Sequence, residues 1–237
     1  MSFGKLGLSK SLLDILDQEN YKAPYPIQEK AIPEILKGND VLGIAQTGSG
    51  KTASYVLPIL SYINVKKGSK NRKIDVLVIV PTRELAQQVK DVFTIFENGS
   101  PNSLKTMAVY GGVSINPQMK ALFGISILVA TPGRLIDLVD SNAVNFDNIQ
   151  TLVLDEADKL LNLGFQKEMN QIFSLLPKKR QNLLFSATLN EKVEEINQIL
   201  LNNPKIINVT PKENNLENIT QLAYSISNDK KGPFLRH

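Results

Sequence analysis

Short apolar runs alternate along the chain with longer segments in which apolar residues recur at helical spacing. The runs have the length of buried strands, for example VLVIV at 76–80, ILVA at 127–130 and TLVL at 151–154. Strands that alternate with helices predict right-handed crossovers and a parallel sheet. The pattern therefore predicts an α/β fold with three α-β-α layers, in which helices cover both faces of a mostly parallel central sheet.

The first expected helix begins after Ser9, whose side chain can cap it, and places four apolar residues between 12 and 16 on one face. The other helices expected from the spacing cover residues 51–63, 84–96, 116–123, 134–140, 165–176 and 191–201. Each of the last six follows a strand or a strand-end loop, as a parallel sheet with crossover helices requires.

Five of the expected strands end in a short polar signature. The signatures are Gln46 to Thr52 after DVLGIA, Pro81 to Glu84 after VLVIV, Thr131 to Arg134 after ILVA, Asp155 to Asp158 after TLVL, and Ser186 to Thr188 after LLF. In an open parallel sheet, ligands bind in the crevice outside the carboxyl ends of the strands. The signatures therefore predict one composite site, which couples a nucleotide to a second ligand at the same edge.

The loop from Ala45 to Thr52 is the most specific local signal. Its glycines allow consecutive backbone N–H groups to surround a phosphate chain, Lys51 can reach the terminal phosphates, and the Thr52 hydroxyl can ligate Mg²⁺. Ala45 stands where the general pattern has Gly, and the alternative is a Gly-Ser turn that leads into a helix. The strand before and the helix after favour a phosphate-binding loop made of Thr47, Gly48, Ser49, Gly50, Lys51 and Thr52.

Asp155 and Glu156 come directly after a buried strand. A carboxylate at this position can hold Mg²⁺, directly or through water, and Glu156 can then orient an attacking water. The alternative for Asp155 is a cap at the start of a helix. Together with Lys51, the two carboxylates predict a phosphoryl-transfer enzyme with Thr52 and Asp155 as metal ligands.

Composition excludes several classes of protein. The chain of 237 residues has no Cys, so it has neither a disulfide framework nor a thiolate metal site. It has no apolar run near the roughly eighteen residues of a membrane span and no apolar leader, so we expect a cytoplasmic protein without a membrane partner. The net charge of +4 permits an anionic partner, and the basic stretch 66–73 is typical of either a solvated loop or a nucleic-acid contact.

Read together, these residues resemble the DEAD-box family of ATP-dependent RNA helicases, which takes its name from the tetrapeptide at 155–158. The resemblance also covers YKAPYPIQ at 21–28, PTRELA at 81–86 and the glycine pair at 111–112. It implies a RecA-like domain that binds ATP and Mg²⁺, with Gln28 on the adenine edge. It also makes Phe3 the family's upstream aromatic; the alternative for Phe3 is simple burial against the first helix. Asn20 and Tyr25 depart from the usual Gly and Thr.

The resemblance assigns the remaining strand-end residues to RNA. Guanidinium forks and backbone N–H groups on such loops can bind phosphate and sugar without reading sequence. The residues implied are Arg83, Gly111, Gly112, Thr131, Gly133 and Arg134. The alternatives are a turn after the strand 106–110 for the glycine pair and a helix entry for Gly133. For Ser186 and Thr188 the resemblance implies a link to Asp158 that couples nucleotide state to RNA binding, and the alternative is a strand-end cap.

The family's helicases hold ATP and RNA between two RecA-like domains, and the second domain supplies catalytic arginines. After Arg180 this chain has only Arg236. We therefore expect an excised N-terminal ATP-binding domain at 1–209, followed at 210–237 by a linker and the start of a second domain, whose first strand would be 219–226. The parent would be an RNA-stimulated ATPase that unwinds short RNA duplexes. The alternatives are an ATP-gated RNA clamp or scaffold without unwinding, and a small-molecule phosphotransferase.

Overall fold

The computed structural model describes residues 2–63, 74–100, 104–209, 222, 224–227 and 230–234. Across these residues the centre of the molecule is a seven-stranded sheet in the order β3-β4-β2-β5-β6-β1-β7. All six strand pairings are parallel. The strands are β1 (Val41–Ile44), β2 (Val76–Ile79), β3 (Thr106–Val109), β4 (Ile127–Ala130), β5 (Thr151–Leu154), β6 (Gln181–Ser186) and β7 (Lys205–Asn208). The predicted parallel sheet is confirmed.

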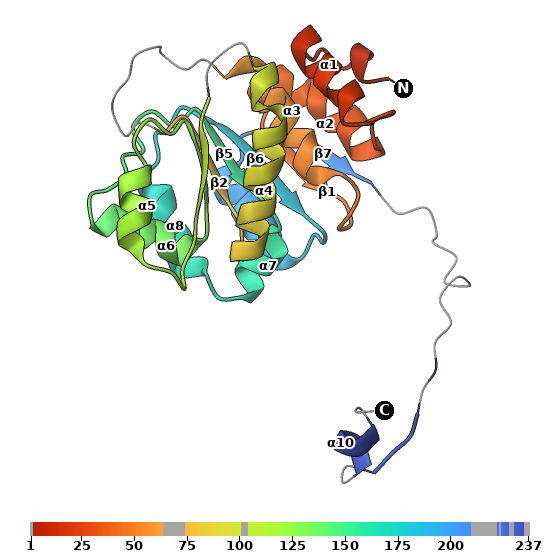
Figure 1. Ribbon diagram of the computed structural model, residues 1–237, viewed down its shortest axis with the longest axis vertical. Helices are drawn as coiled ribbons and strands as arrows, with labels where there is room; N and C mark the ends of the chain where they lie inside the picture. Colours follow the sequence, from red (N-terminus) through yellow and green to blue (C-terminus); the bar gives the residue numbers. More distant parts are fainter. Residues whose placement is uncertain are drawn as a thin grey trace.

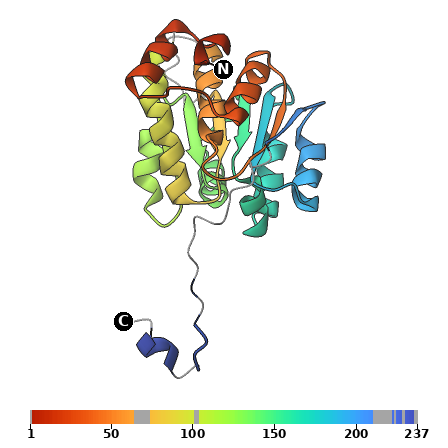
Figure 2. The same cartoon turned by 90° about the vertical axis from the view of Figure 1, so that its right-hand side faces the viewer.

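Helices flank the sheet on both faces (Figures 1 and 2). One face is covered by α1 (Lys10–Gln18), α2 (Pro26–Leu36), α3 (Lys51–Tyr62) and α4 (Arg83–Phe96). The other face is covered by α5 (Ile115–Ala121), α6 (Pro132–Asp140), α7 (Ala157–Asn162), α8 (Gln166–Leu175) and α9 (Glu191–Leu200). Two short 3₁₀ helices, η1 (Phe3–Lys5) and η2 (Glu97–Gly99), complete the layer that contains α1.

Alternate residues of the central strands enter two separate hydrophobic cores, because successive side chains of a strand point to opposite faces of the sheet. The edge strand β7 contributes only Ile207, and its neighbour Ile206 is exposed. In β2, Val76 and Val78 belong to the core under α1 to α4, whereas Leu77 and Ile79 belong to the core on the opposite face. All four side chains are fully buried. The central strands are therefore covered on both sides, which confirms the predicted three-layer arrangement.

Most predicted helices are present within one or two residues of their expected bounds. Ser9 caps α1, and its hydroxyl accepts a hydrogen bond from the backbone N–H of Leu12. Apart from the two short 3₁₀ helices, three elements described between residues 2 and 209 were not predicted: α2, α7 and β7. Two prolines, Pro26 and Pro33, interrupt the helical pattern of α2, although Pro26 occupies the first turn, where a missing N–H costs little.

The strand expected at 219–226 is wrong where the structure describes that segment. Leu222 and residues 224–227 belong to no strand, and the short helix α10 (Lys231–Phe234) follows them. The other residues of that expected strand lie outside the described residues, as do the linker at 210–218 and the basic stretch 66–73. Hydrogen bonds to a neighbouring strand make a strand, and the sequence pattern of a segment does not supply that neighbour.

No helix in the described ranges has both the length and the apolar content to span a membrane.

Candidate nucleotide and RNA site

The strand order divides the carboxyl edge of the sheet into two halves. The phosphate loop, the acidic signature and Ser186 to Thr188 follow β1, β5 and β6, which are adjacent in the sheet. The loops expected to contact RNA follow β2, β4 and β3, which form the other half. Because all seven strands are parallel, both halves open at the same edge, as predicted. The sequence did not predict which signatures are neighbours.

The phosphate loop turns through two glycines with left-handed backbone conformations, Gly48 (φ 83°) and Gly50 (φ 86°). Gly50 is the N-cap of α3, so the helix begins at Lys51. The Lys51 side chain is buried, and its ammonium donates to the carbonyl of Ala45 at 2.5 Å. Burial lowers the pKa of Lys51. The ammonium is therefore held by the loop's own backbone, where phosphate oxygens would be stronger acceptors.

Asp155 lies at the carboxyl end of β5 and is almost fully buried. One carboxylate oxygen accepts from the Tyr55 hydroxyl at 2.9 Å, and the other accepts from the backbone N–H of Glu156 at 2.9 Å. Thr52 lies one turn before Tyr55 on the same helix, α3. Tyr55 therefore ties the carboxylate of Asp155 to the helix that carries Thr52.

Sequence reasoning did not identify Tyr55. The available signal was a tyrosine three residues after Thr52 in an otherwise apolar helical segment, because a buried phenol needs a hydrogen-bond partner. The partner is about a hundred residues away in the sequence, and only the fold identifies it.

The donor set fits a magnesium ion. Mg²⁺ binds oxygen ligands, retains several waters and commonly uses one or two protein side chains together with substrate phosphates. Thr52, in the first turn of α3, and Asp155, directly after β5, supply one hydroxyl and one carboxylate. Within the described residues no group of three or more His, Cys, Asp or Glu side chains could hold a metal ion. Thr52 and Asp155 therefore stay the predicted protein ligands, and phosphate oxygens and water would complete the set.

The buried carboxyl of Asp155 predicts a pH-dependent stability of the ligand-free protein. Burial, as the largest cause, raises the pKa of Asp155 to about 6. The folded state then binds this proton more tightly than the unfolded chain, so the stabilisation present below the unfolded pKa is lost as pH rises from about 4 to 6. We expect Asp155→Asn to raise the unfolding free energy near neutral pH by up to about 3 kcal/mol and to change it little below pH 4. Urea denaturation at both pH values without nucleotide or Mg²⁺ measures this, and an equal effect at both would contradict it.

Glu156 is the N-cap of α7 and has a left-handed backbone conformation with φ 52°. Such a conformation is uncommon for a residue other than Gly, and at functional sites it is a means of directing a side chain. The Glu156 carboxylate pairs with the Lys159 ammonium at 2.9 Å. The two groups hold each other one turn apart at the start of α7.

Asp158 connects the acidic signature to the loop after β6. Its carboxylate accepts from the Thr188 hydroxyl at 3.0 Å, as the resemblance implied. Ser186 does not share this contact, because its hydroxyl donates to the carbonyl of Thr188 at 2.7 Å. The Ser186 carbonyl in turn accepts from the backbone N–H of Ala45, in the phosphate loop. The end of β6 therefore contacts the phosphate loop through Ser186, and the loop after it contacts the acidic signature through Thr188.

Gln28 lies against the phosphate loop in the third position of α2. Its amide oxygen accepts from the Tyr25 N–H at 2.9 Å, and its amide nitrogen donates to the Gly50 carbonyl at 3.1 Å. The side chain is 1% exposed. The Tyr25 ring also lies against Gly50, since a Cβ built on that glycine would be 2.9 Å from Tyr25 Cδ2. Tyr25 and Gln28 thus hold the turn that starts α3.

Asn20, which departs from the family's usual Gly, and Phe3, the upstream aromatic, precede the segment 21–28. Asn20 adopts φ 60°, the left-handed conformation in which Gly is usual and Asn is tolerated. Phe3 is 5% exposed and packs edge-on against Tyr21, with ring centroids 6.5 Å apart. The structure thus shows Phe3 in the core beside α1, and adenine contact by Phe3 stays a prediction.

Arg83 and the glycine pair meet at the RNA half of the edge. Arg83 is exposed on the first turn of α4, and its Nε pairs with Glu84 at 2.5 Å. A Cβ built on Gly112 would be 3.9 Å from Arg83 Nη1. Gly111 and Gly133 have open space where a side chain would stand. Thr131 is the N-cap of α6 without a side-chain capping bond, although its side chain is mostly buried.

Arg134, which the resemblance assigns to RNA, has a largely buried side chain. The side chain is 7% exposed, its Nη2 donates to the carbonyl of Val113 at 2.8 Å, and its Nε bonds Asp137 at 3.2 Å. Its Nη1 is buried without a hydrogen-bond partner among the described residues. The guanidinium therefore holds the loop after β3, and contact of Arg134 with RNA stays a prediction.

Known proteins that are similar to this chain identify its family. The family model of the DEAD/DEAH box helicases matches residues 25–196. This range includes the phosphate loop, the acidic signature and the signatures after β2, β4 and β6. The chain belongs to the DEAD/DEAH box helicase family. It is 41% identical over 232 residues to the DEAD-box ATP-dependent RNA helicase CshA of Streptococcus pneumoniae serotype 4, covering 98% of this chain and 43% of that protein. It is 41% identical over 231 residues to RhpA of Helicobacter pylori strain B128, covering 97% and 46%.

A solved structure shares the fold. A DEAD box protein from the hyperthermophile Methanococcus jannaschii superposes with a TM-score of 0.81 at 33% identity, covering 99% of this chain and 62% of that one. This likeness supports the RecA-like fold implied by the sequence. The chain spans about half the length of the curated relatives it matches.

Proposed function

We propose that this chain is the ATP-binding and RNA-contacting N-terminal domain of an ATP-dependent RNA helicase that separates short RNA duplexes. The observation that carries the proposal is the placement of the phosphate loop and of Asp155 after β1 and β5 at one edge of the sheet, with Tyr55 bonding Asp155 from the helix that carries Lys51 and Thr52. A phosphate-binding lysine, a magnesium-binding hydroxyl and a carboxylate are the groups that phosphoryl transfer from ATP requires. The relatives' names support the helicase part, since both are named ATP-dependent RNA helicases.

Each group has a defined task in ATP binding and hydrolysis. The ammonium of Lys51 leaves the Ala45 carbonyl for the β- and γ-phosphates, and the N–H groups from Gly48 to Thr52 surround the phosphate chain. Mg²⁺, when bound, would neutralise charge on the phosphate oxygens. Glu156 accepts a hydrogen bond from the attacking water and orients it. The contact between Asp158 and Thr188 carries the nucleotide state toward the neighbouring loops.

The RNA half binds a single strand mainly through its backbone. Arg83 supplies charge, and the N–H groups near Gly111, Gly112 and Gly133 supply hydrogen bonds to phosphate and sugar. Such contacts are independent of sequence and weaken with salt. A second RecA-like domain in the parent protein would complete both sites, with residues 1–209 as the first domain and 210–237 as the connection to the second. A cytoplasmic location stays a prediction.

Removal of the Lys51 ammonium tests the phosphate site. We expect Lys51→Ala to weaken ATP binding by about 1.5–3 kcal/mol, because a hydrogen bond between charged groups is lost. Titration calorimetry with ATP and Mg²⁺ measures the change. Lys37→Ala is the matched control, since Lys37 is an exposed lysine that pairs with Glu34 at the opposite edge of the sheet. Unchanged affinity in Lys51→Ala would remove this lysine from the site.

Base selection tests the role of Gln28. Its amide has one further N–H and one further lone pair, which match the amino group and ring nitrogen of adenine and not the reversed pattern of guanine. We expect ATP and ADP to bind better than GTP and GDP, and Gln28→Ala to narrow that difference. Gln181→Ala is the control, because Gln181 also bonds backbone carbonyls but lies at the amino-terminal end of β6. Equal binding of adenine and guanine nucleotides by the unchanged chain would refute the assignment.

A further inference from the structure

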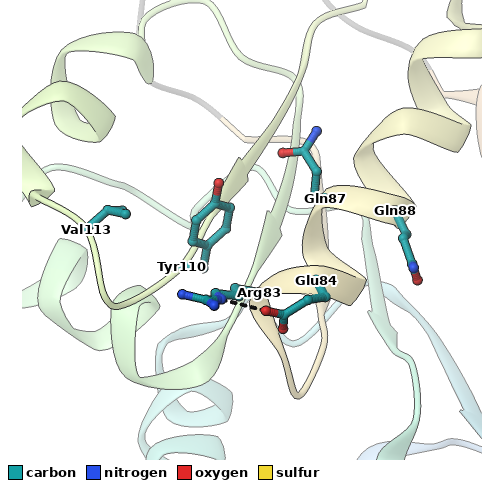
Figure 3. Close-up of a pocket in the computed structure, with 6 residues that line it drawn as sticks. All are labelled: Arg83, Glu84, Gln87, Gln88, Tyr110 and Val113. Atoms are coloured by element: carbon teal, nitrogen blue, oxygen red, sulfur yellow. Dashed lines mark hydrogen bonds and ion pairs between the residues drawn. The ribbon is translucent and has the colours of Figure 1, made fainter.

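A hollow at the RNA half of the edge has a composition that contact with phosphate alone does not explain. It is lined by Arg83, Glu84, Gln87 and Gln88 from α4 and by Tyr110 and Val113 after β3. Figure 3 shows the Tyr110 ring standing between Val113 and the first turns of α4, with Arg83 beside the ring and Gln87 on the side of its hydroxyl. An aromatic face, an apolar side wall, amides and a cation therefore surround one open space.

The Tyr110 backbone is fixed in place by a single buried side chain. Gln118, from α5, accepts from the Tyr110 N–H at 3.2 Å and donates to the Tyr110 carbonyl at 3.2 Å. Tyr110 is the first residue after β3, where the strand's own hydrogen bonds end. The two hydrogen bonds to Gln118 replace them. The Tyr110 backbone therefore has a defined position at the mouth of the hollow.

The backbone of Val113, three residues after Tyr110, is held by Arg134 of α6. Its carbonyl accepts from the buried guanidinium of Arg134, and its side chain is 49% exposed. An exposed valine and a partly buried tyrosine thus face the hollow from a loop whose backbone is fixed at two points. The rigidity matters because a preformed apolar wall loses little conformational entropy when a ligand binds.

We propose that this hollow is a subsite for one nucleobase of single-stranded RNA, which stacks on Tyr110 and contacts Val113. The inference rests on the proposed function, because the backbone of the same strand would be held by Arg83 and the glycine pair. A Cβ built on Gly112 would be 3.9 Å from Arg83 Nη1, and Arg83 also lines the hollow, so a phosphate held by these two residues would lie beside it. Single-stranded bases commonly stack on aromatic side chains, and amide groups such as those of Gln87 and Gln88 bond base edges.

The subsite would give this domain a contact with a base in addition to its contacts with the RNA backbone. Stacking tolerates every base, because each has an aromatic face, whereas the amides of Gln87 and Gln88 can favour some base edges over others. RNA from which bases have been removed would keep its phosphate contacts and lose only this one.

The test compares a fluorescein-labelled oligouridylate with an abasic oligoribonucleotide of the same length, by anisotropy at low salt. We expect Tyr110→Ala and Tyr110→Leu to weaken oligouridylate binding about five- to hundredfold and abasic binding less than about twofold, while Tyr110→Phe keeps both. Tyr110→Leu retains apolar bulk beside the core, so the test survives if the alanine variant fails to fold. Phe123→Ala is the control, since Phe123 is an exposed aromatic that precedes β4 at the opposite edge.

Equal losses for both probes, or no loss for either, would overturn the base subsite and leave the proposed RNA function standing. The same conclusion follows if the unchanged chain binds the abasic probe as tightly as oligouridylate. Failure of the unchanged chain to bind either probe would overturn the proposed RNA function and the subsite together.

Discussion

The 237-residue chain is expected to bind ATP and to hydrolyse it slowly, with little stimulation by RNA. Charge that develops on the γ-phosphate must be met by a cation, and an arginine finger contributes roughly 10³–10⁵ to the rate in related nucleotide hydrolases. The three arginines in the described residues are engaged elsewhere. Arg83 pairs with Glu84, Arg134 bonds the Val113 carbonyl, and Arg180 donates to the Pro177 carbonyl.

A longer protein that includes the second domain should therefore turn over ATP faster than this chain by roughly 10³–10⁵ when RNA is present. Phosphate release by both proteins, with and without single-stranded RNA, measures the ratio. Binding of ATP by the 237-residue chain, followed by calorimetry, confirms that a slow rate reflects chemistry and not an empty site. Fast, RNA-stimulated hydrolysis by the chain alone would contradict the account.

Glu156→Gln in the longer protein should lower turnover by roughly 10²–10⁴ and leave ATP affinity nearly unchanged, because a neutral amide is a weaker hydrogen-bond acceptor than a carboxylate for the attacking water. The substitution keeps the size of the side chain and its ability to bond Lys159. Glu195→Gln, on the exposed side of α9, is the matched control.

A Glu156→Gln variant that binds ATP poorly would give this residue a structural task in place of a catalytic one. One that hydrolyses at the normal rate would show that another group orients the water. Measuring ATP affinity and turnover separately decides between these outcomes. Only a group that acts in the transition state changes turnover without changing affinity.

The sequence predicted the working edge of the sheet because two simple regularities act together. Buried parallel strands have continuous apolar runs, and crossover connections bring their carboxyl ends to one side. The signatures at Lys51, Asp155 and Thr188 therefore could be placed at one edge without the structure. Which strands are neighbours depends on long-range pairing, which the local pattern does not encode. The fold therefore was needed to show that the signatures predicted for nucleotide and those predicted for RNA follow two separate groups of adjacent strands.

Side-chain partners account for the remaining differences. Arg134 has the residue type and position of a phosphate ligand, but the loop after β3 supplies a carbonyl that holds its guanidinium in a buried position. Tyr55 belongs to an apolar helical segment, and its hydrogen bond to Asp155 joins positions far apart in the sequence. Ser186 was expected to act on Asp158, yet its hydroxyl bonds within its own loop. Each of these hydrogen bonds depends on the folded position of the side chain and its partner, which the residue type alone does not give.

Strand displacement tests the central claim most directly. The longer protein, incubated with ATP, Mg²⁺ and a short RNA duplex that carries a single-stranded tail, should release the labelled strand, and the 237-residue chain should not. An ATP-gated clamp would instead bind the duplex with ATP and release no strand. The account predicts release that depends on ATP and on the second domain. Displacement by the 237-residue chain alone, or RNA binding by the longer protein without any displacement, would contradict it.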